Sequence, residues 1–121
     1  MSETCVLVVD DEPGMRETLV EILSASGYVV SAAADGDAAL AALRRDPFDV
    51  VLMDIRMPGR DGVSVLQELG EPPPHVILMT AYARAERIRE GLEAHAYAVM
   101  TKPFPVPELL GLVASAAATP A

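Results

Sequence analysis

Short apolar runs alternate along the chain with segments in which apolar residues repeat at helical spacing. The runs are predicted to be β-strands, because each is short and is bounded by polar residues, glycine or proline. They lie at 5–9, 28–32, 50–53, 75–80 and 98–101. Apolar residues at consecutive rather than alternate positions are typical of strands that are buried on both faces. The pattern therefore predicts a parallel sheet covered by helices.

The segments between these runs carry apolar residues at the spacing of amphipathic helices. The helices are expected to begin near Pro13, Asp35, Asp61, Arg84 and Pro105. Asp35 and Asp61 are expected to cap their helices, since aspartate accepts hydrogen bonds from the unpaired amides of a first turn. Gly27 and Pro47 are expected to end the first two helices, and the prolines at 72–74 to form a stiff connector.

This order of elements predicts an α/β fold, with a doubly wound five-stranded parallel sheet and helices on both faces. Because crossovers are right-handed, few strand orders are possible, and 2-1-3-4-5 is one of the two common ones. At 121 residues the chain is predicted to form a single domain, 1–121. The alanine-rich tail 115–121 is expected to resemble a linker, which favours a segment cut from a longer protein.

Charged side chains stand where three of the predicted strands end. Asp10 and Asp11 follow the first strand, Asp54 the third and Lys102 the fifth. Ligands of such sheets bind at the carboxyl ends of the strands, and strands 1 and 3 are neighbours in the predicted order. These side chains are therefore expected to meet in one pocket.

A metal ion is expected in this pocket, because packed carboxylates repel one another unless a cation joins them. Oxygen-rich sites of this kind suit Mg²⁺. Asp11 is expected to bind the ion directly and Asp10 directly or through water. Asp54 and the backbone carbonyl of Arg56 could supply further oxygen ligands.

Asp54 is the predicted reactive group, because an aspartate carboxylate can attack a phosphoryl group and form an acyl phosphate. Such a transfer needs mainly positioning and electrostatic stabilisation, chiefly from a metal and a lysine. Lys102 is expected to pair with Asp54 at rest and with a phosphoryl oxygen after transfer. Thr80, at the end of the fourth strand, could donate its hydroxyl to the same group.

Composition narrows the choice of partners and location. The formal net charge of −9 argues against direct binding to nucleic acid, which needs clustered Lys and Arg. With 51% hydrophobic and 22% charged residues the chain is expected to be globular. The sequence has no apolar run near the ~20 residues that span a bilayer, and 1–4 do not resemble a signal peptide. These features favour a soluble cytoplasmic protein without a membrane partner.

Four motifs occur in order: V-L-V-V-D-D-E, V-V-L-M-D-I-R-M-P-G-R-D-G, V-I-L-M-T-A and T-K-P-F. Together they resemble the receiver domain of two-component response regulators, across essentially the whole chain. The resemblance implies a flavodoxin-like fold in which Asp54 is the phosphoacceptor of a sensor histidine kinase. It also implies that Asp10, Asp11 and the carbonyl of Arg56 bind Mg²⁺.

The same resemblance implies how the signal would leave the pocket. Thr80 and Lys102 match the switch positions of the family, and the bond between Lys102 and Pro103 is expected to be cis. The implied activity is self-phosphorylation and autodephosphorylation rather than turnover of a substrate. The face of the fourth helix, fifth strand and fifth helix is expected to control an effector domain or partner, and could form a homodimer.

The sequence departs from the family pattern beside the fifth strand. Receivers usually carry Tyr or Phe three residues before the lysine, where this chain has Val99. His95 and Ala98 replace the usual Gly and Asp of this segment. The nearest aromatic is Tyr97, which a period of two places on the same strand face as Val99. How the signal is relayed therefore stays open.

Three other functions compete with a phosphorylation switch. A degenerate receiver that acts only as a docking module is compatible with Val99. A phosphatase with an aspartyl-phosphate intermediate would need an acid/base carboxylate where Arg56 stands. A nucleotide- or flavin-binding module would need a glycine-rich motif after the first strand, where Asp10 and Asp11 stand instead.

Overall fold

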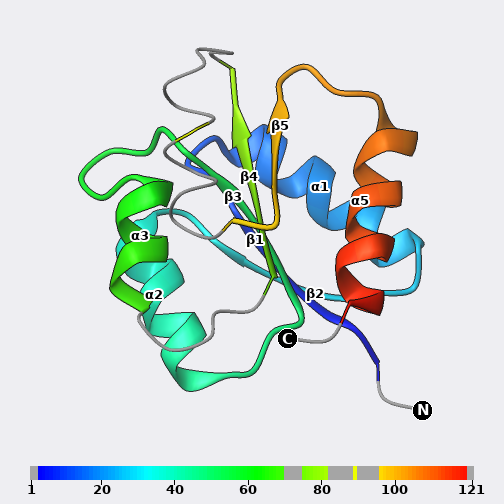
Figure 1. Ribbon diagram of the computed structural model, residues 1–121, viewed down its shortest axis with the longest axis horizontal. Helices are drawn as coiled ribbons and strands as arrows, with labels where there is room; N and C mark the ends of the chain where they lie inside the picture. The colour runs from blue at the N-terminus through cyan, green and yellow to red at the C-terminus, as the bar shows by residue number, and fades with distance from the viewer. Residues whose placement is uncertain (1–2, 70–74, 82–88, 90–95, 120–121) are drawn as a thin grey trace.

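The computed structural model describes residues 3–69, 75–81, 89 and 96–119, and the structural statements below concern these residues. A five-stranded sheet runs through the centre of the molecule with the order β2-β1-β3-β4-β5 (Figure 1). Its strands are β1 (Cys5–Val9), β2 (Val29–Ala33), β3 (Val50–Asp54), β4 (His75–Thr80) and β5 (Ala98–Thr101). Each neighbouring pair is parallel. The predicted fold class and strand order are confirmed.

Helices cover both faces of the sheet, as expected. They are α1 (Pro13–Ala25), α2 (Gly36–Arg45), α3 (Gly62–Leu69) and α5 (Val106–Ala118). In Figure 1, α2 and α3 lie on one side of the sheet and α1 and α5 on the other. None of the helices in the described part of the chain is long and apolar enough to cross a membrane.

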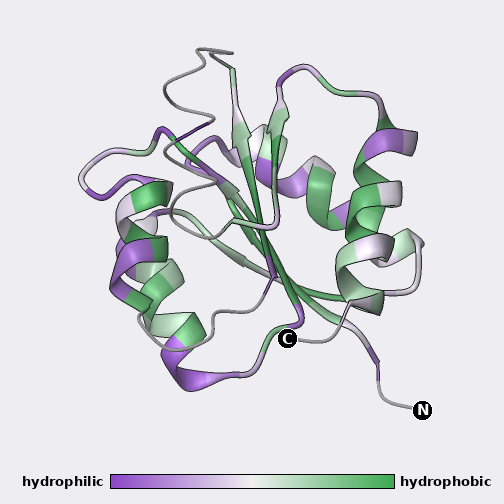
Figure 2. Ribbon diagram, in the orientation of Figure 1, coloured by the Kyte–Doolittle hydropathy of each residue, from purple (hydrophilic) through white to green (hydrophobic). Residues whose placement is uncertain are grey.

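Two hydrophobic cores result, one on each face of the sheet. Leu7 of β1 packs toward α2 and α3, whereas its neighbour Val8 packs toward α1 and α5. Successive side chains of a strand point to opposite faces, and helices cover both faces of the sheet. All four residues Val6, Leu7, Val8 and Val9 are therefore fully buried. Figure 2 shows the same result as apolar strands in the middle of the sandwich. Continuous apolar runs are thus the sequence signature of this double burial.

The predicted helix caps form at α2 and α3. The Asp35 carboxylate accepts a hydrogen bond from the Ala38 amide at 2.8 Å, and Asp61 accepts one from the Ser64 amide at 2.8 Å. Gly27, after α1, has a φ of 98°, a left-handed conformation that glycine adopts at little cost. Local chemistry therefore sets where these helices begin and end.

Some boundaries differ from the sequence prediction. β2 spans Val29–Ala33 rather than 28–32, and β3 extends to Asp54 rather than ending at Met53. The expected linker-like tail 115–121 is helical as far as Ala118, because alanine favours helix and Ala116 is fully buried in the core. The connector expected at 72–74 and the helix expected from Arg84 lie outside the described residues.

Candidate functional site

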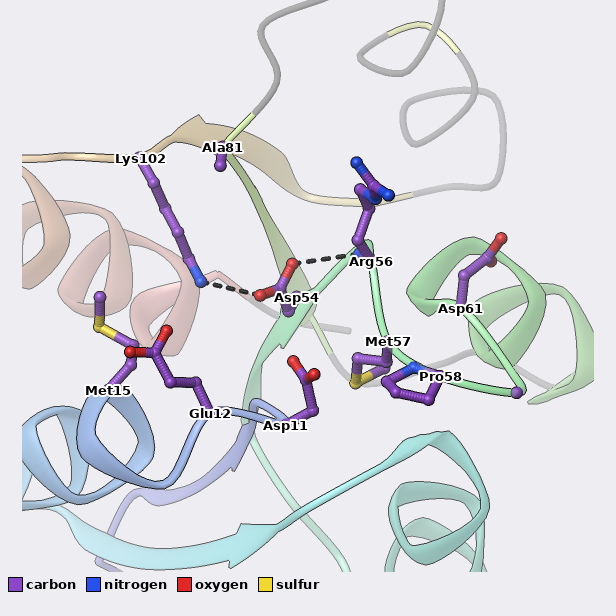
Figure 3. A pocket seen from close by; sticks show the side chains of 11 residues that line it. Asp11, Glu12, Met15, Asp54, Arg56, Met57, Pro58, Asp61, Ala81 and Lys102 are labelled. Atoms are coloured by element: carbon purple, nitrogen blue, oxygen red, sulfur yellow. Dashed lines mark hydrogen bonds and ion pairs between the residues drawn. The ribbon is translucent and has the colours of Figure 1, made fainter.

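An open pocket of about 680 Å³ lies where β1, β3 and β4 end (Figure 3). Parallel pairing of β1 with β3 places Val9 beside Met53, so the residues that follow, Asp10 and Asp54, are also neighbours. The pocket is lined by Asp11, Glu12, Met15, Asp54, Arg56, Met57, Pro58, Gly59, Asp61, Ala81 and Lys102. The topology thus brings the acidic residues and the lysine together, as predicted.

The carboxylates of Asp10, Asp11 and Asp54 form one cluster. Each offers an oxygen, and these atoms lie within 4.8 Å of one another. Asp10 is fully buried and Asp54 is 9% exposed, whereas Asp11 is exposed and lines the pocket. A donor set made only of carboxylates fits a hard divalent cation such as Mg²⁺.

Lys102 reaches the cluster from the end of β5. Its Nζ donates to Asp54 Oδ2 at 2.8 Å and to Asp10 Oδ2 at 3.0 Å. Burial lowers the pKa of Lys102 and is the largest single influence, but the hydrogen bonds to Asp54 and Asp10 and the negative charges of these two residues together outweigh it. The pKa therefore lies above its ordinary value, and the ammonium remains charged at neutral pH.

Backbone hydrogen bonds fix the two acidic residues that Lys102 contacts. Asp10 Oδ1 accepts from the amide of Glu12 at 2.9 Å, and Asp54 Oδ1 accepts from the amide of Arg56 at 3.1 Å. The side chain of Arg56 points away from Asp54, so the main chain of this residue lies nearest the carboxylate (Figure 3). Both carboxylates are therefore oriented before any ligand binds.

Thr80 is the last residue of β4 and is 1% exposed. Its carbonyl accepts a hydrogen bond from the amide of Lys102 at 2.7 Å, which ties the end of β4 to the start of the lysine loop. The neighbouring Ala81, rather than Thr80, is among the pocket-lining residues. The bond between Lys102 and Pro103 is cis, as the resemblance implied.

Val99 and Tyr97 lie on opposite faces of the sheet, and the prediction that they share a face is wrong. Val99 packs against the core beside α2 and α3, whereas Tyr97 packs against the core beside α1 and α5. Tyr97 precedes β5, which begins at Ala98, so the period of two does not extend to it. Its hydroxyl lies 2.6 Å from Ser115 Oγ in α5.

Sequence reasoning missed part of the pocket wall. Glu12 and Met15 line it beside the acidic pair, and Met57 lines it beyond Asp54. Only their positions in the sequence could have indicated this, because they come shortly after the ends of the two strands that carry the predicted acidic residues. His75 is half-buried, and its ring lies against the ring of Tyr97 in a T-shaped contact, with 5.3 Å between the ring centroids. His95 lies outside the described residues.

Comparison with known proteins agrees with this geometry. Residues 6–114 match the family described as the response regulator receiver domain. The chain is 36% identical to sporulation initiation phosphotransferase F of Bacillus subtilis, over 86% of each chain. It is 39% identical to the response regulator protein FleR of Pseudomonas aeruginosa, over 90% of this chain but only 24% of FleR.

Solved structures give the same result. A chain in the crystal structure of the CheX–CheY–BeF3–Mg²⁺ complex of Borrelia burgdorferi superposes with a TM-score of 0.85 at 28% identity. The match covers 93% of this chain and 87% of the other. With a family match that spans most of its length, this chain belongs to the response regulator receiver domain family.

Proposed function

We propose that this chain is the phosphoacceptor switch of a two-component phosphorelay, and that a sensor histidine kinase transfers a phosphoryl group to Asp54. The observation that carries the proposal is the position of the Asp54 carboxylate. It lines an open pocket, bonded to Lys102 on one oxygen and to the amide of Arg56 on the other.

The transfer would form an acyl phosphate on Asp54. One carboxylate oxygen attacks phosphorus, the P–N bond to the kinase histidine breaks, and its electron pair returns to the imidazole nitrogen. Lys102 keeps its proton. Its ammonium, which pairs with the Asp54 carboxylate at rest, would then pair with the negatively charged phosphoryl oxygens. Autodephosphorylation would follow when water attacks the same phosphorus: the P–O bond to Asp54 breaks, the carboxylate is restored and inorganic phosphate leaves.

The residues of the pocket fit Mg²⁺. Three clustered carboxylates against the single ammonium of Lys102 leave an excess of two negative charges, 3 − 1 = 2. Asp11 is exposed in the pocket and would bind the ion directly, together with Asp54 and the carbonyl of Arg56. Asp10 is fully buried, and it would bind the ion directly or through water. The bound ion would neutralise charge on the transferred group.

The phosphorylated domain, 1–121, would then change its preference for an effector domain or partner. Thr80 would donate its hydroxyl to the phosphoryl group, and the change would reach β5 and α5, together with the helix that the sequence predicts from Arg84. A homodimer could also form through these elements. The chain covers about a quarter of FleR, which is named as a response regulator protein. We therefore propose that the output of this receiver is a further domain or a partner protein. The net charge of −9 argues against direct contact of this domain with nucleic acid. The domain would act in the cytoplasm.

Mass spectrometry tests this function directly. Wild-type protein incubated with acetyl phosphate and Mg²⁺ should gain the mass of one phosphoryl group, and Asp54→Asn should gain none while keeping its circular dichroism spectrum. Labelling of Asp54→Asn to the level of wild type would place the acceptor elsewhere.

A docking module without phosphorylation is the second candidate, and Val99 at the usual aromatic position is the observation that favours it. If wild-type protein takes up no phosphoryl group from acetyl phosphate or from a range of histidine kinases, the docking module would be favoured over the switch.

A further inference from the structure

The loop 55–61 joins β3 to α3 and forms one wall of the pocket. Met57, Pro58 and Gly59 line the pocket, and the Arg56 amide bonds to Asp54. The start of the loop is fixed to the sheet, because the amide of Ile55 donates to the carbonyl of Met79 at 2.8 Å. The position of this wall therefore depends on what holds its far end.

Arg60 holds the far end through its side chain. Its Nε donates to Asp37 Oδ1 at 3.0 Å, in the first turn of α2, and its Nη1 donates to Glu68 Oε1 in α3. Glu68 also pairs with Arg44, Nη2 to Oε2 at 3.6 Å. The planar guanidinium of arginine can bond two carboxylates in fixed directions, which a lysine ammonium cannot do as well.

The backbone of Arg60 is packed against α2 as well. A Cβ added to Gly36, the first residue of α2, would stand 2.7 Å from the carbonyl oxygen of Arg60. The Arg60 amide donates to the carbonyl of Pro58 at 3.1 Å, and Gly59 between them has a φ of 79°. The loop thus turns back on itself and rests directly on the start of α2.

We propose that Arg60 is a positioning residue of the phosphoacceptor site: its ion pairs with Asp37 and Glu68 hold the loop 55–61 where the Arg56 main chain meets Asp54 and the metal. This inference rests on the proposed function and deepens it. Arg60 is not one of the described residues that line the pocket, so it would act on the site through the loop.

The charges of this network support the assignment. The hydrogen bond to Asp37 and then that to Glu68 raise the pKa of Arg60 above its ordinary value, so the guanidinium is charged at neutral pH. Exposed ion pairs are weak one by one, but a network that joins two helices to one loop restrains the loop more than an isolated pair does.

The sign of the expected effect separates positioning from simple electrostatics. Removing a positive charge near an acidic pocket should by itself strengthen the binding of a cation. If Arg60 positions the loop, Arg60→Ala should instead weaken Mg²⁺ binding, because the Arg56 carbonyl is no longer held in place. We expect the Mg²⁺ concentration for half-maximal phosphorylation of Asp54 to rise about threefold, with the rate at saturating Mg²⁺ unchanged.

The experiment compares Arg60→Ala, Arg60→Lys and Asp37→Asn with the control Arg45→Ala. Arg45 forms an ion pair with its neighbour Asp46 at 3.0 Å, and its replacement removes the same charge from an exposed pair at the other end of α2. Two quantities are measured: amide exchange of peptides covering 55–61 without Mg²⁺, and phosphorylation by acetyl phosphate across a Mg²⁺ titration.

The proposal is supported if Arg60→Ala and Asp37→Asn show faster exchange of 55–61 and a higher half-maximal Mg²⁺ concentration. Arg60→Lys should show smaller changes of the same kind, and Arg45→Ala should show none. Exchange and Mg²⁺ dependence equal to those of Arg45→Ala would overturn it. Asp37→Asn keeps the arginine. If Arg60→Ala is poorly folded, the amide exchange of 55–61 in Asp37→Asn decides the question, because loss of a negative charge at Asp37 would weaken Mg²⁺ binding by itself. If the wild type itself is not phosphorylated, the proposed function fails, whereas the exchange comparison still decides whether Arg60 holds the loop.

Discussion

The ammonium of Lys102 lies 2.8 Å from Asp54 Oδ2 and occupies one of the two oxygens on which a phosphoryl group could be placed. This pair joins the ends of β5 and β3 across β4, and it is largely shielded from water, with 14% of the lysine side chain and 12% of the aspartate side chain exposed. Lys102 is the only lysine in the chain, so its titration can be followed without interference from another ammonium side chain.

Alkaline pH should weaken the fold through this lysine. The folded pKa of Lys102 is raised, so the folded state holds the proton more tightly than the unfolded state does. Its contribution is complete below the ordinary lysine pKa of about 10.4 and is lost as pH rises through the folded value. In Lys102→Arg the charge persists, so the free energy of unfolding should fall less steeply over this range. Urea unfolding followed by circular dichroism measures both slopes, and equal slopes would contradict the prediction.

Mg²⁺ should stabilise the wild type by relieving repulsion among the three carboxylates. At a concentration 100-fold above its dissociation constant the gain would be ~2.7 kcal/mol. Asp11→Ala should lose most of the shift in melting temperature, because this residue is the exposed carboxylate of the cluster. Glu17→Ala is the matched control: it removes one exposed negative charge from α1, outside the pocket lining. A shift in Asp11→Ala as large as in Glu17→Ala would remove Asp11 from the site.

Gly62→Ala should destabilise the protein and slow phosphorylation together. A Cβ at Gly62 would stand 2.6 Å from the carbonyl oxygen of Asp54, so the backbone that carries the acceptor must move. We expect a loss of ~1–3 kcal/mol, as for other overpacked sites. Gly111→Ala is the control, because nothing lies within 4 Å of a Cβ there. It should stabilise α5 by about 0.5–1 kcal/mol. Thermal unfolding of both variants compares the signs directly.

The parts of the fold that the sequence predicted are those in which local pattern and global structure agree. Asp10, Asp11 and Asp54 could be placed together because they stand at the carboxyl ends of strands that are buried on both faces, and neighbouring parallel strands end at one edge of the sheet. The Asp35 and Asp61 caps could be predicted because a cap is made within one turn of its helix.

Contacts between distant segments could not be predicted in this way. Arg60 and Asp37 are 23 residues apart, and only the packing of the loop on α2 brings them together. Tyr97 was assigned to the wrong face because strand alternation was extended one residue before β5. Its partner Ser115 had been placed in a linker, whereas burial of Ala116 keeps this turn helical.

The relay from the pocket should depend on Thr80 and only weakly on Val99. A hydrogen bond from the Thr80 hydroxyl to a charged phosphoryl group would be worth ~1.5–3 kcal/mol, enough to move the end of β4. Val99 pairs with Leu78 in the sheet, and a β-branched side chain has little freedom to swing into space that Thr80 leaves. Tyr97 does not replace the missing ring, because it packs on the other face with its hydroxyl at Ser115.

Chemical-shift mapping with beryllofluoride and Mg²⁺ as a phosphoryl mimic tests this relay. Wild type and Val99→Ala should show similar changes at 75–81 and 96–101, because the movement begins at the Thr80 hydroxyl rather than at the side chain of residue 99. Thr80→Ala should lose most of these changes while residues 10–12 and 54–56 still respond, since the mimic and the metal continue to occupy the pocket. That local response is the internal control for binding. An undiminished response at 96–101 in Thr80→Ala, or its loss in Val99→Ala, would show that the signal reaches β5 by another route.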